Sequence, residues 1–235
     1  SGGAISFGGA ISANADLQQM MHNILKREYT SSMFASAPLP PVINITGQTF
    51  NITSNLNIDH NITFTGCTFL FTPNAKITVA AGKTLTLNGC TLKACCNAMW
   101  DGIYASDPSA EIVIENGTTL QDMENGVVVS GQAKLNATNS TFINSYNGIQ
   151  LLNLPTSYIG IIQENDFTKT GTLLPRSATT PNPLITGIRI VDCEKIIIGD
   201  ETNPLLKNNF NALETGIYIE NNLISSTYGE IITNY

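Results

Sequence analysis

The chain has 235 residues, only 12% of them charged, and carries a formal net charge of −7. Its eleven Lys and Arg residues are scattered, so they form no basic run of the kind that binds nucleic acid. No apolar stretch approaches the ~20 residues that span a bilayer. Five cysteines at irregular spacing are too few for a small disulfide scaffold, and they lack the paired spacing of a structural zinc site.

Residues 1–41 form an N-terminal segment whose pattern differs from the rest of the chain. The sequence Gly-Gly-Ala-Ile-Ser occurs at 2–6 and again at 8–12, and it suggests a flexible or edge-strand segment. Apolar residues at helical spacing then predict an amphipathic helix over about 16–29: Leu17, Met20, Met21, Ile24 and Leu25. This helix would cap the first coil of the repeat that follows, or alternatively bind a partner by itself. Pro38, Pro40 and Pro41 form a short, stiff connector.

From residue 42 onward, three short strand-like patterns recur. One is a Gly followed by an apolar, any, apolar triplet, at Gly102, Gly126, Gly148, Gly187 and Gly216. The second is an alternating middle strand, at 77–79, 112–114, 159–161, 196–198 and 231–232. In the third, a small or polar residue stands two places before a large apolar one, as in Asn165 and Phe167. Three strands per repeat of roughly two dozen residues predict an all-β parallel solenoid of about seven to eight coils over 42–235.

Strand alternation assigns side chains to the inside or the outside of this solenoid. After each leading Gly, one column should point inward: Ile103, Val127, Ile149, Ile188 and Ile217. The column beside it should point outward: Tyr104, Val128, Gln150, Arg189 and Tyr218. A polar column should lie inside near a turn, where stacked polar groups can hydrogen-bond to the backbone of neighbouring coils: Cys67, Cys90, Thr118, Ser140, Asn165 and Asn208.

Two long intervals, at about 170–183 and 200–207, interrupt the repeat. In a solenoid such insertions leave from one corner as surface loops, often on the binding face. The chain stops within a strand-like run at 230–235, which is a ready template for another strand. The Gly-Gly-Ala-Ile-Ser duplicates could lie against such an edge in a neighbouring copy, which predicts a homo-oligomer or filament joined through the coil ends.

The repeats resemble the right-handed parallel β-helix proteins of the pectin-lyase-like superfamily over about 42–235. Asn-Gly-Cys-Thr-Leu at 88–92, the Cys95 and Cys96 pair, and Met-Trp-Asp-Gly-Ile at 99–103 look like one subgroup of it. That subgroup comprises large secreted or cell-surface β-helix proteins of Bacteroidota. The resemblance therefore implies a β-helix that is secreted or displayed at the cell surface, while its motifs are weak indicators of any activity.

Several members of the superfamily cleave acidic polysaccharides, so the resemblance raises the possibility of an enzyme. The hydrolases of this fold share Asn-Thr-Asp, Asp-Asp, Gly-His-Gly and Arg-Ile-Lys motifs, and none is complete here. Arg189-Ile190 is followed by Val191, adjacent aspartates are absent, and neither His lies between glycines. A glycosidase also needs two carboxylates facing each other across the scissile bond, for which the sequence offers no pair. The sequence favours a protein that is not an enzyme.

The superfamily lyases hold Ca²⁺ with several carboxylates beside an Arg base. The best match to such a site is Arg189 with Asp192 and Glu220, which could share a face; an incidental surface ion pair is the alternative. We therefore expect no cofactor, with Ca²⁺ as the single candidate. Aromatic and polar side chains could instead bind a sugar: Trp100, Tyr104, Gln150, Arg189 and Tyr218. Trp100 is alternatively a packing residue at a corner of a coil.

Buried free thiols are one interpretation of the cysteines. The other is a disulfide among the first four, Cys67, Cys90, Cys95 and Cys96, which an extracellular setting would favour. The sequence as a whole predicts a non-catalytic, extracellular, structural or adhesive β-helix module, able to assemble end to end. The alternative is a β-helix that binds or cleaves a polysaccharide. Neither nucleic acid nor a membrane span is expected.

Overall fold

The structure, a computed structural model, describes residues 10–11, 42–155, 158, 160–176, 184–200, 203, 206–220 and 230–233. These residues contain strands, labelled β1 to β23, and no helix. All of the pairings between the strands are parallel, as a solenoid requires. The helix predicted over about 16–29 and the proline connector lie outside the described residues, so both stay predictions.

The strands form three long sheets, which the chain visits in turn and which we number I, II and III. Sheet I contains β2 (Ile43–Thr46), β5 (Ile62–Thr65), β8 (Thr84–Asn88), β11 (Glu111–Glu115), β14 (Lys134–Thr138) and β17 (Ile161–Gln163). Sheet II contains β1 (Ala10–Ile11), β3 (Thr49–Ile52), β6 (Thr68–Phe71), β9 (Thr91–Ala94), β12 (Thr119–Gln121), β15 (Thr141–Ile143), β18 (Asp166–Thr168) and β21 (Asn209–Asn211). Sheet III contains β4 (Leu56–Ile58), β7 (Lys76–Val79), β10 (Trp100–Ala105), β13 (Met123–Val129), β16 (Asn147–Leu152), β19 (Thr186–Val191) and β22 (Thr215–Glu220).

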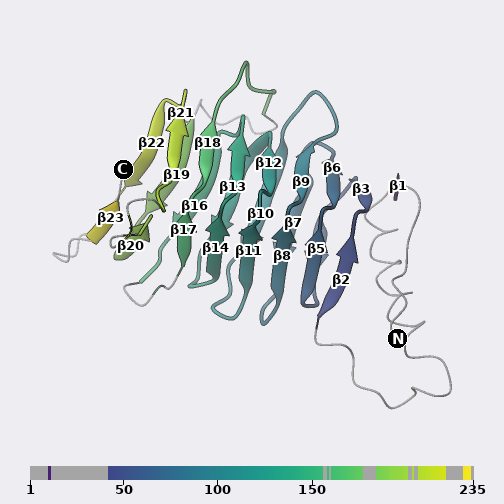
Figure 1. The fold of residues 1–235 in the computed structure, drawn as a ribbon, viewed down its shortest axis with the longest axis horizontal. Helices are drawn as coiled ribbons and strands as arrows, with labels where there is room; N and C mark the ends of the chain where they lie inside the picture. The colour runs from purple at the N-terminus through teal and green to yellow at the C-terminus, as the bar shows by residue number, and fades with distance from the viewer. Residues whose placement is uncertain are drawn as a thin grey trace, which may run out of the picture.

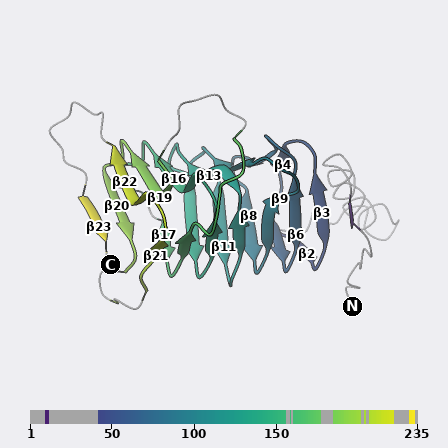
Figure 2. The same ribbon diagram turned by 90° about the horizontal axis from the view of Figure 1, so that it is seen from above.

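Each circuit of the three sheets makes one coil, from coil one (β2, β3 and β4) to coil seven. Coil seven begins with β20 (Lys195–Ile198), which pairs in parallel with β23 (Glu230–Thr233), the first strand of an eighth circuit. Figure 1 shows the coils stacked side by side along the long axis of the molecule, and Figure 2 shows the same stack from above. The predicted all-β parallel solenoid of seven to eight coils is confirmed.

The interior of the solenoid is built from columns of apolar side chains. The inward column of sheet III is buried as predicted, with Ile103, Val127, Ile149 and Ile188 at 0% exposure and only Ile217 of coil seven half-buried. Aromatic rings stack between successive coils of sheet II, with centroids 4.7 Å apart for Phe142 and Phe167 and 5.1 Å for Phe167 and Phe210. Such offset stacking adds to the stabilisation that burial already gives.

The recurring glycine in β10, β13, β16, β19 and β22 of sheet III has a steric cause. Gly126 has a φ of +73°, and a Cβ atom at this position would overlap the carbonyl oxygens of Asn147 and Gly148 in the next coil. Only a residue without a side chain lets successive coils approach this closely at that point. The recurring Gly is therefore a packing requirement of the stack, and it carries no information about function.

The polar inward column lies at the corner between sheets I and II, as predicted. All six side chains are buried; five bond to backbone oxygens of neighbouring coils, and Ser140 Oγ donates to Thr138 O of its own coil. Thr118 Oγ1 donates to Leu87 O at 2.9 Å, and the amide of Asn165 donates to Ala137 O at 2.7 Å. Asn165 also donates to the side-chain oxygen of Asn208 at 3.0 Å, so the last rungs form an asparagine ladder. The column satisfies backbone groups that the bend of each coil leaves without a strand partner.

Two of the predicted middle strands were wrong. Residues 77–79 lie in sheet III, where Ile77 pairs with Leu56 and Ile103; the repeat was misread because Lys76 occupies the position that Gly102 takes in the next coil. The strand predicted at 159–161 is β17, Ile161–Gln163. Ile162 is the buried residue and Ile161 is 44% exposed, because a shift of one residue exchanges the two faces of a strand.

Two residues of the second Gly-Gly-Ala-Ile-Ser copy are described, and they form an edge strand. Ala10 and Ile11 form β1, which pairs in parallel with Thr49 and Phe50 of β3 in the same chain. This strand lies at the first edge of sheet II. The first copy, at 2–6, lies outside the described residues.

Candidate functional site

The outer face of sheet III carries the side chains that the sequence singled out. The strand register aligns Tyr104, Val128, Gln150, Arg189 and Tyr218 in one row along the rod, as predicted. Tyr104, Arg189 and Tyr218 are half-buried, whereas Val128 and Gln150 are only 8% and 6% exposed. We call this row, together with the polar side chains bonded to it, the sheet III face.

A chain of hydrogen bonds links the first half of the sheet III face. Asp101 Oδ1 accepts from Tyr104 Oη at 2.6 Å and from Asn125 Nδ2 at 2.6 Å. Gln150 Nε2 then donates to the backbone oxygen of Asn125 at 2.6 Å. Three successive coils are therefore connected, and the Asp101 carboxylate holds the polar ends of two neighbouring side chains in fixed positions.

The second half of the face is an ion pair joined to the same chain. Arg189 Nη1 donates to Gln150 Oε1 at 3.2 Å, and Arg189 Nη2 donates to Glu220 Oε2 at 3.0 Å. Arg189 and Glu220 side chains are 35% and 34% exposed, so solvent screens their attraction and the pair adds little stability. The pair instead fixes the orientation of the Arg189 guanidinium, because two partners hold this group while it still reaches solvent.

Tyr104 is held by contacts on two sides. Burial, followed by its hydrogen bond to Asp101, raises the pKa of the Tyr104 hydroxyl well above the usual value. Lys76 Nζ lies 5.1 Å from the centre of the Tyr104 ring, within cation–π range. The hydroxyl therefore stays protonated at neutral pH and donates to Asp101 throughout.

The two calcium candidates are on neighbouring coils, and the Asp192 amide donates to Glu220 O at 2.9 Å. The Glu220 carboxylate, however, accepts the hydrogen bond from Arg189. Among the described residues, no group of three or more His, Cys, Asp or Glu side chains could hold a metal ion. Two carboxylates, one of them already paired with a cation, do not supply the several oxygen ligands that Ca²⁺ takes.

A loop lies beside the sheet III face, at the corner between sheets II and III. Residues 169–176, which we call the strap, belong to the insertion expected at about 170–183 and run back over earlier coils. Thr170 N donates to Asn144 Oδ1 of coil five at 2.8 Å, and the Met99 amide of coil three donates to Pro175 O at 3.0 Å. Over 170–176, the described part of this insertion, the chain is a surface loop that leaves from one corner, as predicted.

The strap is fastened by a largely buried ion pair. Arg176 Nη2 and Nε donate to Glu124 Oε1 at 3.1 and 3.3 Å, and the two side chains are 12% and 6% exposed. The Arg176 guanidinium also lies 4.8 Å from the centre of the Tyr146 ring. Removing one partner of a buried pair leaves the other charge uncompensated, so this contact holds the strap against coils four and five.

The family of the chain follows from its repeats. A family model described as "Right handed beta helix region" matches residues 42–160, about half of the chain. The chain belongs to the right-handed β-helix family. Comparisons with curated proteins and with solved structures find no significant match. Within the described residues, no helix is long and apolar enough to cross a membrane.

Trp100 does not contribute to the surface of this β-helix protein. Its side chain is 0% exposed, stacks on Phe71 with ring centroids 4.0 Å apart, and donates from Nε1 to Gln121 O at 2.8 Å. The prediction that Trp100 binds sugar was wrong, because the bend into β10 turns the indole inward. The alternative, a packing residue at a corner of a coil, is confirmed.

The cysteines of the β-helix divide into two kinds. Cys95 and Cys96, which are exposed, are joined by a disulfide between adjacent residues, so one of the disulfide candidates is confirmed. Cys67 and Cys90 are free and buried, and so is Cys193. The Sγ atoms of Cys67 and Cys90 donate to the backbone oxygens of Ile45 and Phe64. These two thiols thus act as rungs of the polar column.

Several residues of the site were not singled out from the sequence. Asn125 and Glu124 stand just before the leading Gly126, outside the three patterns that defined the repeat. Arg176 lies within an insertion that has no repeat partner, so nothing in the pattern placed it near Glu124. Two sequence features could have suggested the pair of Arg176 and Glu124: a basic residue within an insertion, and an acidic residue shortly before a leading Gly.

Proposed function

We propose that this β-helix protein is a non-catalytic, extracellular, adhesive module whose sheet III face binds an extended polysaccharide. The observation that carries the proposal is the continuous polar row from Tyr104 through Gln150 to Arg189 and Glu220. Its donors and acceptors are held in place before any ligand arrives, which lowers the entropic cost of binding. Its resemblance to secreted and cell-surface β-helix proteins supports the extracellular setting.

The shape of the face favours a polymer over a small ligand. Successive strands of a parallel sheet lie ~4.8 Å apart, so the row presents Tyr104, Arg189 and Tyr218 at regular positions along the rod, with the buried Val128 and Gln150 between them. Tyr104 and Tyr218 stand near its two ends, and their ring faces suit the apolar surfaces of sugars. The strap lines one side of the face and would limit how far a polymer moves toward sheet II.

Binding without cleavage is favoured by the state of the acids. Asp101 accepts two hydrogen bonds, Glu220 is paired with Arg189, and Glu124 is paired with Arg176. A glycosidase needs one carboxylate free to donate a proton and a second free to attack or to activate water. Each of these three carboxylates instead has a positioning contact within the protein.

Affinity electrophoresis in gels that contain neutral or acidic polysaccharides tests the proposal. We expect retardation of the wild-type protein by at least one polysaccharide, and its loss in Arg189→Ala and Tyr218→Ala. Thr86→Ala, on the outer side of sheet I, is the matched control and should be retarded like the wild type. Equal retardation of all three variants, or none of the wild type, would count against this face.

The same mixtures should be assayed for unsaturated products and new reducing ends, with and without Ca²⁺. Turnover that depends on Arg189 would mean that the protein is a polysaccharide-cleaving enzyme and not a non-catalytic adhesive module. End-to-end assembly into filaments is a separate part of the proposal, and light scattering over a range of concentrations tests it. A monodisperse monomer at high concentration would remove filament formation and leave the binding face intact.

A further inference from the structure

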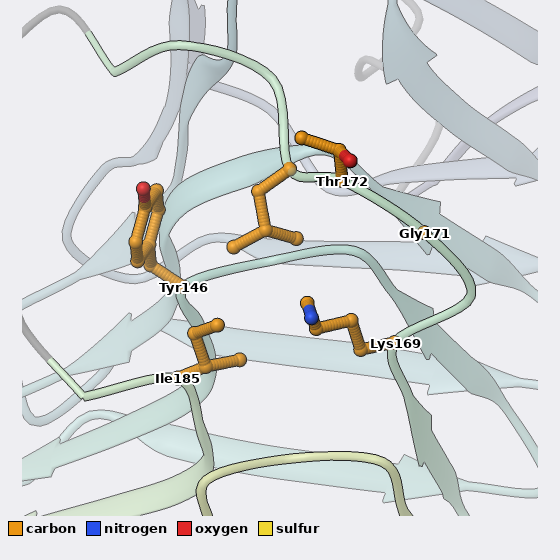
Figure 3. A pocket seen from close by; sticks show the side chains of 6 residues that line it. Tyr146, Lys169, Gly171, Thr172 and Ile185 are labelled. Carbon is orange, nitrogen blue, oxygen red and sulfur yellow. The ribbon is translucent and has the colours of Figure 1, made fainter.

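A second hollow lies apart from the row of polar residues, beneath the base of the strap. It is an open pocket of about 530 Å³ lined by Tyr146, Lys169, Gly171, Thr172, Leu173 and Ile185. Figure 3 shows the side chains of Tyr146, Lys169 and Ile185 arranged around this space. Its size falls in the range of ~300–1,000 Å³ that is typical of pockets for small molecules.

The walls of the pocket combine polar groups with an aromatic ring and two aliphatic side chains, and contacts outside the pocket fix these apolar parts. Ile185 is only 9% exposed, and its amide donates to Glu214 Oε2 at 2.9 Å. One side of the Tyr146 ring faces the Arg176 guanidinium, which sets the orientation of the ring. Leu173 is half-buried and belongs to the strap itself. A ligand would therefore meet hydrocarbon and an aromatic ring on surfaces that exist before it binds.

One charged side chain, that of Lys169, lines the pocket beside these apolar side chains. The Lys169 side chain is half-buried, and its backbone amide is held by Asn211 O at 3.1 Å, which fixes the point from which the side chain extends. In the described part of the chain, its ammonium group has no hydrogen-bonded or ion-paired side chain. Glu214, the acid that contacts the pocket wall, is bonded to the Ile185 amide. The pocket thus places one cation beside an aromatic ring and two aliphatic side chains.

We propose that this pocket binds a small organic carboxylate with an apolar or aromatic body. The Lys169 ammonium would bind the carboxylate, and Leu173, Ile185 and Tyr146 would cover the body of the ligand. A charge-assisted hydrogen bond in a half-desolvated site is stronger than a neutral one, so the anion is preferred to its neutral analogue. The strap forms one wall, so the pocket depends on the Glu124–Arg176 contact that fastens the strap. This inference is independent of polysaccharide binding by the sheet III face.

Methyl NMR spectra of protein labelled at Ile and Leu test the proposal, with benzoate as the probe and benzyl alcohol as its neutral analogue. We expect saturable shifts of the Ile185 and Leu173 methyl signals with benzoate, and much weaker binding of benzyl alcohol. Lys169→Gln keeps most of the side-chain length without the charge, and should weaken benzoate binding at least ~tenfold. Lys134→Gln removes an exposed lysine of sheet I and should bind like the wild type.

Three results would overturn the proposal: no saturable shift with benzoate, equal affinity for benzyl alcohol, or unchanged benzoate affinity in Lys169→Gln. The spectra also report on folding, since the inward Ile and Leu methyl groups keep their shifts only if the coils stay stacked. A Lys169→Gln protein with native core signals and unchanged benzoate binding would mean that the cation has no part in recognition. Loss of polysaccharide binding by the sheet III face would leave these outcomes unchanged.

Discussion

The asparagine ladder at the corner of sheets I and II should make Asn165 one of the most sensitive polar positions in the protein. Asn165 is 0% exposed, its Oδ1 accepts from Ser140 N at 3.2 Å, and its Nδ2 donates to Ala137 O at 2.7 Å. Asn165→Ala leaves the buried Ser140 amide without that acceptor, at about 1–3 kcal/mol, and removes the bond to Ala137, at about 1 kcal/mol. We therefore expect the free energy of unfolding to fall by about 2–4 kcal/mol.

Urea titration followed by fluorescence measures this loss, because the single, buried Trp100 reports on the coils next to it. Circular dichroism should be recorded in parallel, since stacked repeats can unfold in more than one step. Asn209→Ala is the matched control: it lies on the next coil and its side chain is exposed, bonding to Asp166 at 2.8 Å. We expect a change within about 0.5 kcal/mol for this variant. Equal losses in the two variants would refute the role assigned to the buried ladder.

Three further outcomes are expected. Gly126→Ala should lower the free energy of unfolding by more than about 2 kcal/mol in the same titration, because Gly126 has a positive φ and the added methyl group would overlap the next coil. Gly171→Ala is the control, and it should not cause this loss because the space around the added methyl group is open. Without reductant, a thiol reagent should label no cysteine of the native protein and three cysteines of the unfolded protein; all five should react only after unfolding and reduction. A single reactive thiol in the unfolded, unreduced protein would mean that Cys67 and Cys90 also form a disulfide. Above pH ~10 the unfolded state ionises its tyrosines while folded Tyr104 keeps its proton, so the free energy of unfolding should fall as pH rises. In Tyr104→Phe the free energy of unfolding should fall less steeply with pH. Parallel pH profiles of the two proteins would contradict the raised pKa of Tyr104.

The repeat could be read from the sequence because three local constraints recur from coil three onward. A Gly is needed where successive coils of sheet III touch, an inward polar residue is needed at one bend, and a large apolar residue fills the core two places later. Each constraint leaves the same residue types at the same interval. The register of the leading Gly strands and of the polar column therefore followed from the sequence alone.

The two misread strands show the limit of this reasoning. At Lys76 the coil tolerates a side chain, so the signal that identifies sheet III is missing and residues 77–79 look like any alternating strand. At 159–161 a run of apolar residues permits two registers that differ by one position. Ile162 is buried and Ile161 is exposed only because Ile162 pairs with Ala137 across the coils. That choice is made by a tertiary contact and not by local pattern.

The candidate sites also differ in whether the sequence pattern could predict them. The row of Tyr104, Gln150 and Arg189 was predictable, because residues at equivalent positions of a solenoid must lie side by side. The strap was not, because an insertion has no equivalent in other coils, and its contact from Arg176 to Glu124 spans 52 residues of sequence. Function in a repeat protein is therefore best sought where an insertion returns to the regular surface. On this β-helix that place is the corner of sheets II and III, where the strap borders the sheet III face and encloses the Lys169 pocket.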